Sequence, residues 1–181
     1  MNEFSETVAR VRYKDTDQMG MVYYGNYFTF FEIGRVEYMR ERGIAYKNME
    51  REDDSYIVVA EASCRYLRPA RYDDLLRIRT RVSESRRRSI RFAYEILRHD
   101  SGEMLATGET VHIICNREGR PKSLPEKYRQ VFPLKSQVEL RENLRSAKPS
   151  GRLQTALRSH ERCNRHARFR NRNDPILSAA A

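Results

Sequence analysis

The chain has 181 residues, with 35 Lys and Arg against 25 Asp and Glu, a formal net charge of +10, and 39% hydrophobic residues. This is the size of one domain, or of a smaller domain with an extension. No segment approaches the ~20 consecutive apolar residues of a membrane span, and the first residues lack an apolar signal core. Three cysteines without a CxxC pair argue against a zinc site and a disulfide scaffold. We therefore expect a soluble, cytoplasmic protein.

The first half of the chain predicts a strand, a loop and a long helix. Apolar and basic residues alternate over residues 5–14, as in a strand, and residues 15–21 read as a loop. From about Tyr24 the pattern becomes helical, and Gly43 is typical of the position just after a helix end. A helix of roughly 20 residues is ~30 Å long, enough to cross a small sheet. Its apolar stripe consists of Tyr27, Phe30, Phe31, Gly34 and Tyr38.

Four further strands follow, each with apolar residues at a period of two. They cover residues 56–67, 76–82, 90–97 and 104–116. In the first of them one face carries Val58, Ala60, Ala62, Cys64 and Tyr66. A hairpin at residues 99–103 joins the last two strands, and Pro125 begins a short helix to about Phe132. Such one-sided alternation is typical of an antiparallel sheet with one face covered, so the predicted fold class is α+β.

The positive charge is concentrated at the C-terminus. Residues 146–181 hold eight Lys and Arg against two acidic residues, a net charge of +6. Their few, scattered apolar residues cannot build a core. We predict a folded domain over residues 1–135 and a basic tail, weakly helical or disordered, over residues 136–181.

The segment from Tyr13 to Glu32 has the most specific pattern, YKDTDQMGMVYYGNYFTFFE. It resembles the signature of the 4-hydroxybenzoyl-CoA thioesterase family, most closely its YbgC-type acyl-CoA thioesterase branch. The resemblance covers residues 4–133. It implies the hotdog fold, in which a five-stranded antiparallel sheet wraps a long central helix. It also implies hydrolysis of an acyl-CoA, with a short aliphatic or an aromatic acyl group, by a homo-oligomer (dimer or tetramer) that uses no cofactor.

Asp17 is the candidate catalytic residue. It lies just before a long helix, whose first N–H groups are unpaired and carry partial positive charge. Backbone donors near Tyr24 and Gly25 could stabilise the oxyanion of a thioester placed there, and Gly25 allows close approach. The resemblance assigns the attack to Asp17, either as a general base on water or as a nucleophile. The alternative is that Asp17 only caps the loop or pairs with an arginine.

Two neighbours of Asp17 have more than one interpretation. The resembling branch usually has His at the position of Tyr24, and a phenol does not exchange a proton near pH 7 as readily as an imidazole does. Tyr24 therefore orients Asp17, water or the thioester by a hydrogen bond, or only lines the pocket. Asn26 is a candidate for substrate binding, although we expect its side chain to cap the helix.

A second candidate site is the run SRRRS at residues 85–89, which falls in a turn between two predicted strands. Coenzyme A carries phosphates that arginine side chains bind well. We predict that Arg87, Arg88 and Ser89 bind its nucleotide, and Arg68 is a weaker candidate. The alternative is a solvated turn that hinders pairing at the sheet edge.

The sequence is also compatible with two other functions. One is a non-catalytic hotdog protein that binds an acyl-CoA or an acyl carrier protein. Another is nucleic-acid binding through the basic tail, which we disfavour because the domain lacks an RNA-binding motif. No second metal ligand accompanies His112 at a suitable spacing, so we expect no metal site.

Overall fold

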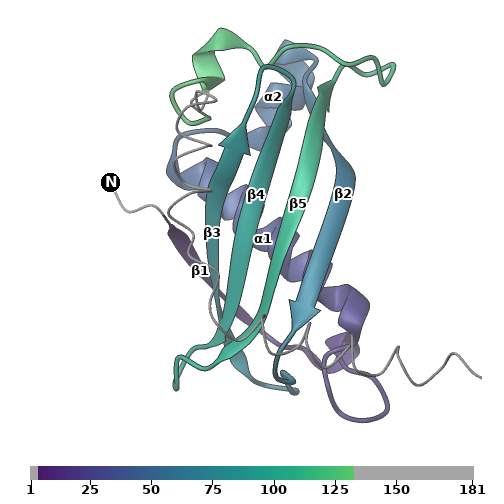
Figure 1. Cartoon of the computed structure of the whole chain (residues 1–181), viewed down its shortest axis with the longest axis vertical. Coiled ribbons are helices and arrows are strands. Elements are labelled where there is room, and N and C mark those ends of the chain that lie inside the picture. The colour runs from purple at the N-terminus through teal and green to yellow at the C-terminus, as the bar shows by residue number, and fades with distance from the viewer. Residues whose placement is uncertain (1–3, 133–181) are drawn as a thin grey trace, which may run out of the picture. The chain divides into compact units, whose positions relative to one another are not determined.

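The computed structural model describes residues 4–132, and the predicted basic tail at residues 136–181 lies outside them. One long helix, α1 (Tyr27–Glu41), lies behind a five-stranded sheet (Figure 1). A 3-10 turn at Tyr24–Asn26 precedes it, and a short helix, α2 (Tyr46–Asp53), follows it. The strands are β1 (Ser5–Arg10), β2 (Tyr56–Tyr66), β3 (Leu75–Ser85), β4 (Ser89–Arg98) and β5 (Met104–Cys115).

The sheet has the order β1-β3-β4-β5-β2, and all four pairings are antiparallel. The predicted α+β class, with five antiparallel strands around a central helix, is confirmed. The long connection through α1 and α2 carries the chain from β1 at one edge to β2 at the other. Among the described residues, no helix is long and apolar enough to cross a membrane.

The core lies between α1 and the covered face of the sheet. The entire predicted stripe of α1 is buried, and the Phe31 ring stacks on Tyr94 of β4 at 4.5 Å between centroids. Two glycines allow this close packing. A Cβ at Gly108 of β5 would clash with the Phe31 ring and lie 2.6 Å from the carbonyl oxygen of Ser63. A Cβ at Gly34 of α1 would lie 2.8 Å from Ile78.

Two predicted elements differ from the structure, and one helix was not predicted. The first strand ends at Arg10 rather than residue 14, because the chain turns into a 3-10 helix at Tyr13–Asp15. Helix α2 was not predicted, since Met49 is its only buried residue and it shows no apolar stripe. Residues Glu126–Tyr128 form only a 3-10 turn, with Pro125 before its first residue.

The prediction that Val58, Ala62 and Cys64 lie on one face of the second strand is also wrong, because β2 contains a bulge between Val59 and Glu61. Val58 pairs with the exposed Ile113, on the face away from α1. After the bulge, Ala62 and Cys64 pair with Thr110 and Gly108, on the α1 face. One extra residue thus moves the alternation to the opposite face.

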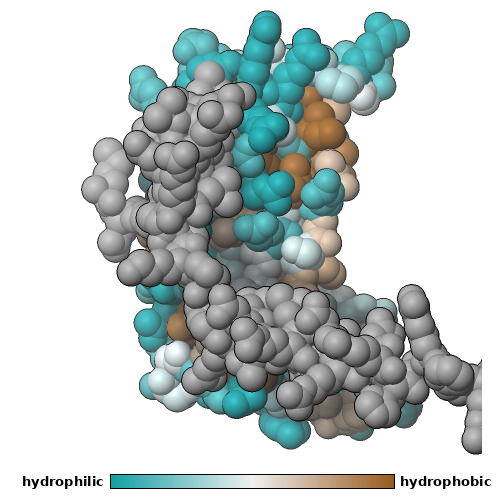
Figure 2. Space-filling view, viewed as in Figure 1, coloured by the Kyte–Doolittle hydropathy of each residue, from teal (hydrophilic) through white to brown (hydrophobic). Residues whose placement is uncertain are grey.

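Strand β2 is an edge strand with exposed apolar side chains. It pairs only with β5 within the described residues. Val58 and Val59 are 49% and 52% exposed, and hydrophobic surface extends along this side of the sheet (Figure 2). An apolar edge with unpaired backbone groups is a site for pairing with another strand.

Candidate active site

Asp15 holds together the two ends of the loop between β1 and α1. We call this point, where Asp15 meets Tyr23 and Asn26, the neck of the loop. The Asp15 carboxylate is buried and accepts hydrogen bonds from the backbone N and Nε of Arg12, at 2.8 and 3.3 Å. The Asp15 carbonyl oxygen accepts one from the backbone N of Tyr23 and one from Nδ2 of Asn26, both at 2.9 Å. The two ends of the loop, at Asp15 and Tyr23, are therefore held together directly before the helix start.

Asp17 lies in the tight turn at the end of this loop. Its backbone N donates to the Met21 carbonyl oxygen at 2.8 Å, and Gly20 closes the turn with a φ of +70°. Its Oδ1 accepts hydrogen bonds from the N–H groups of Met19 and Met21, at 2.8 and 3.3 Å. Within the described residues Oδ2 accepts none. The capping role foreseen for Asp17 is thus present, and it occupies one carboxylate oxygen.

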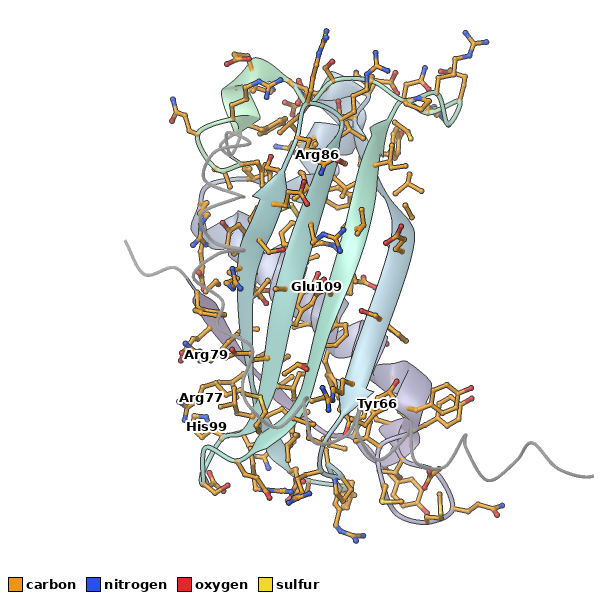
Figure 3. The ribbon with its side chains drawn as sticks, viewed as in Figure 1. Tyr66, Arg77, Arg79, Arg86, His99 and Glu109 are labelled. Atoms are coloured by element: carbon orange, nitrogen blue, oxygen red, sulfur yellow. The ribbon has the colours of Figure 1, made fainter. Side chains whose placement is uncertain are left out.

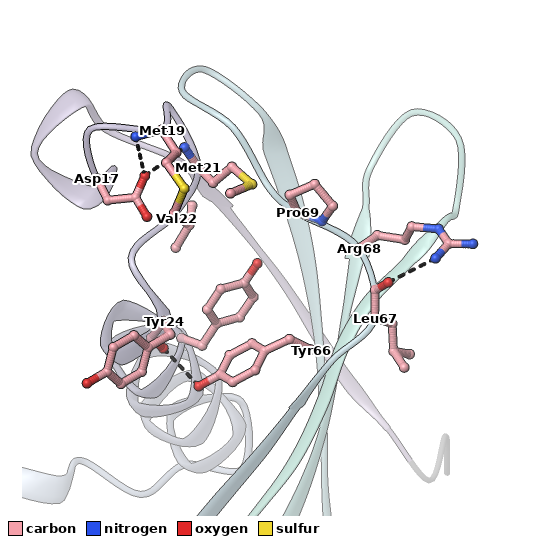
Figure 4. Close-up of a pocket in the computed structure, with 10 residues that line it drawn as sticks. Asp17, Met19, Met21, Val22, Tyr24, Tyr66, Leu67, Arg68 and Pro69 are labelled. Carbon is pink, nitrogen blue, oxygen red and sulfur yellow. Dashed lines mark hydrogen bonds between the residues drawn. The ribbon is translucent and has the colours of Figure 1, made fainter.

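Asp17 and Tyr24 line the same cavity of about 370 Å³ (Figure 4). Its walls come from the loop, the start of α1 and the segment that follows β2. The other lining residues are Met19, Met21, Val22, Tyr27, Tyr66, Leu67, Arg68 and Pro69. Most of these side chains are apolar or aromatic, so the cavity suits an apolar group brought next to a carboxylate.

The helix start contributes backbone donors beside this cavity. Within residues 4–132 the N–H groups of Tyr24 and Gly25 make no hydrogen bond, as expected at the first positions of a helix. The Tyr24 carbonyl oxygen accepts a hydrogen bond from the Tyr66 hydroxyl at 3.1 Å. Burial, with a contribution from Cys64, raises the pKa of Tyr66 to about 12, so its hydroxyl remains a donor.

Asn26 does not cap the helix with its side chain, contrary to expectation. Its amide is directed instead at the Asp15 carbonyl oxygen. A Cβ at Gly25 would meet only the Tyr23 ring, at 3.0 Å, so the backbone there is open to close approach apart from that ring.

The turn between β3 and β4, residues 86–88, is the arginine turn. It lies at the opposite end of the sheet from the cavity. Tyr66 pairs with Ala106 of β5, whereas Ser89 pairs with Ile113, about 24 Å away at the usual strand rise. Figure 3 shows this separation through the labelled Tyr66 and Arg86. Arg87 contacts Ser123 Oγ at 2.9 Å through its Nε. The structure therefore brings Asp17, Tyr24 and Gly25 together and leaves Arg87, Arg88 and Ser89 apart from them.

Sequence reasoning missed the wall formed by Tyr66, Leu67 and Pro69, and Arg68 was only a weaker candidate. Arg68 donates to the Leu67 carbonyl oxygen at 3.1 Å and lies 3.7 Å from Glu103. The sequence signal available was Pro69, which ends the strand beside the cavity. Among residues 4–132, no three His, Cys, Asp or Glu side chains lie close enough to hold a metal ion.

Comparisons with known proteins agree with this architecture. Residues 11–132 match the thioesterase-like superfamily. The acyl-CoA thioesterase YbgC of Haemophilus influenzae is 33% identical over 133 residues, which are 72% of this chain and 95% of that protein. The structure named Probable Thioesterase from Bartonella henselae is 34% identical, with a TM-score of 0.64, over 67% of this chain and 99% of that one. DHNA-CoA thioesterase from Staphylococcus aureus is 28% identical, with a TM-score of 0.69, over 80% and 97% of the two chains. The chain therefore belongs to the thioesterase-like superfamily and has the hotdog fold that the sequence resemblance implied.

Proposed function

We propose that this chain is an acyl-CoA thioesterase that hydrolyses its substrate to a free acid and coenzyme A. The family and the names of its relatives support the reaction class. One structural observation supports the site: Asp17 and Tyr24 line one largely apolar cavity at the start of α1. The acyl group would occupy this cavity, with the thioester carbonyl directed toward the N–H groups of Tyr24 and Gly25, from which no described residue accepts a hydrogen bond.

In the general-base route, Asp17 takes a proton from water as the water oxygen adds to the thioester carbon. The carbonyl oxygen becomes an oxyanion, which the two backbone N–H groups stabilise. Collapse of this intermediate breaks the carbon–sulfur bond, and the protonated Asp17 returns the proton to the leaving thiolate. Because Oδ1 is held by Met19 and Met21, Oδ2 is the oxygen available for this exchange.

In the nucleophilic route, an Asp17 oxygen attacks the thioester carbon itself and expels the thiolate. The resulting acyl–aspartyl anhydride is then hydrolysed by water. Tyr24 has no imidazole to serve as a second base in either route. Tyr24 contributes its ring to the cavity wall, and this ring packs on the Tyr23 ring at 4.4 Å between centroids.

The experiment that tests this function is a hydrolysis panel of aliphatic acyl-CoAs of increasing length and benzoyl-CoA, with the wild type and Asp17→Asn. The variant should lose kcat by ~10²-fold or more, the usual scale for losing general acid–base help. Asp100→Asn, in the exposed β4–β5 hairpin, is the matched control and should retain activity. Wild-type kcat in a folded Asp17→Asn variant would rule out this mechanism. Binding without hydrolysis of any acyl-CoA would favour the non-catalytic acyl binder.

We also propose that the enzyme is a homo-oligomer in which a second copy pairs along β2. The exposed edge of β2 and its apolar Val58 and Val59 support this arrangement. A second copy also offers another arginine turn, since the turn of the same chain lies ~24 Å along the sheet from the cavity. A monomer in sedimentation at micromolar concentration would contradict the proposal.

A further inference from the structure

We propose that Asn26 is a positioning residue for the reaction, which holds closed the neck of the loop that carries Asp17. This inference rests on the proposed function, because its consequence for turnover requires Asp17 to be the reacting group. Asn26 itself makes its hydrogen bond to the backbone of Asp15 and not to Asp17.

The Asp15 carbonyl oxygen is a well-anchored acceptor for this contact. Asp15 is only 6% exposed, and its carboxylate is bonded to the backbone N and Nε of Arg12. The backbone N of Asp15 in turn donates to the Arg12 carbonyl oxygen at 2.9 Å. Asn26 therefore ties the start of α1 to an anchored point at the end of the 3-10 helix Tyr13–Asp15.

The position of this tie determines where the site residues lie. Asp17 follows Asp15 by two residues, and Tyr24 follows Tyr23 directly, so both groups lie next to the neck. Tyr23 and Asn26 bond the same Asp15 oxygen from the return side of the loop, and the backbone N of Asn26 donates to the Tyr23 carbonyl oxygen at 2.9 Å. Opening the neck would therefore shift Asp17 relative to the donors at the helix start.

The chemistry of the contact explains the residue type. The side chain must be short and must offer a donor, because the Asp15 carbonyl is only an acceptor. Asp at position 26 has nearly the volume of Asn, but it places a carboxylate oxygen against that carbonyl. Because Asn26 makes no side-chain capping bond, this substitution does not remove a helix cap.

The test compares Asn26→Asp with Asn48→Asp in the full chain. Asn48 lies on α2, and its side chain makes no hydrogen bond with the described residues, so its variant should behave as wild type. Asn26→Asp should lower kcat by about 10- to 100-fold, the scale of a small misplacement of reacting groups, with KM little changed. In the Asp17→Asn background the same change should have almost no further effect.

Two kinetic outcomes would overturn the inference. A raised KM with unchanged kcat in Asn26→Asp would mean that Asn26 binds substrate directly. If the double variant lost kcat by the product of the two single losses, Asn26 would act independently of Asp17. Hydrogen exchange gives a readout that does not depend on activity: the amides of Tyr23 and Asp17 should exchange faster in Asn26→Asp. Unchanged exchange would reject the positioning role, whether or not the protein hydrolyses a thioester. Inactivity of the wild type, with faster exchange in Asn26→Asp, would reject only the proposed function.

Discussion

The Tyr66 hydroxyl donates a hydrogen bond to the carbonyl oxygen of Tyr24, at 3.1 Å and across 42 residues of sequence. This contact joins the end of the edge strand β2 to the first turn before α1. The Tyr66 ring also packs against Tyr27 at 5.1 Å between centroids. The wall of the cavity and the backbone donors at the helix start are therefore held in register by one side chain.

Tyr66→Phe should lower kcat by several-fold and leave the fold intact. The ring contact with Tyr27 remains, while one hydrogen bond of net value ~0.5–1.5 kcal/mol is lost. Kinetics and a thermal melt measure the two effects. Tyr72→Phe is the matched control, because Tyr72 is exposed and packs on Tyr13 away from this contact. Equal kcat values for the two variants would show that the Tyr66 hydroxyl does not support the site.

Replacing Arg87 and Arg88 together by Ala should raise KM for acyl-CoA by roughly tenfold, since exposed charge-assisted contacts supply binding far from the reacting carbonyl. Turnover of a short pantetheine thioester, which lacks the nucleotide, should hardly change. Arg117→Ala, at an exposed turn on the same end of the sheet, is the control. If both substrates suffer equally, the arginines are structural, for example through the contact of Arg87 with Ser123.

His112 makes stability depend on pH. It is fully buried, and its Nε2 lies 2.8 Å from Thr110 Oγ1. Burial, reinforced by the positive charge of Arg35, lowers the pKa of His112 from 6.5 to about 4. The unfolded chain therefore binds a proton more readily, and folding stability is lost as pH falls from about 6.5 to about 4. The loss attributable to His112 is on the order of 3 kcal/mol.

Chemical denaturation of the wild type and of His112→Gln across this pH range measures the effect. The variant should show a flatter dependence of unfolding free energy on pH, whatever its absolute stability. Parallel curves for the two proteins would show that His112 does not titrate in this way.

Gly108→Ala should destabilise the domain by ~1–3 kcal/mol, the usual range for an overpacked core. The added methyl group has to displace the Phe31 ring, which is stacked on Tyr94, or the backbone at Ser63. Gly25→Ala is the matched control for stability, because its Cβ meets only the exposed Tyr23 ring. The melting temperatures of the two variants check this, and an unchanged value for Gly108→Ala would contradict the packing argument.

The long amphipathic elements were predictable from sequence because tertiary packing follows their periodicity. The stripe of α1 and the buried residues of β3 and β4 agree with the predicted faces. The bulge in β2 was not predictable, since Ala60 resembles any other small residue of an alternating strand. The order of the strands, which leaves β2 at an edge, also depends on contacts distant in sequence.

The candidate site was only partly predictable for the same reason. Asp17, Tyr24 and Gly25 lie within one short motif, so local sequence was sufficient to group them. Tyr66 joins them only through the folded sheet. Asp15 appears in sequence as another loop acid, but it is buried and bonded to Arg12, so Asp15→Asn is not a neutral control for Asp17→Asn.

The position of Tyr66 at the end of β2 has a consequence for folding kinetics. Among residues 4–132, strand β2 is attached to the sheet only through β5, whose residues lie about 40 to 60 positions further along the chain. Such non-local pairing forms late, because a long loop has to close first. During refolding, helical signal should therefore return before catalytic competence, which has to wait until β2 has docked beside the helix start.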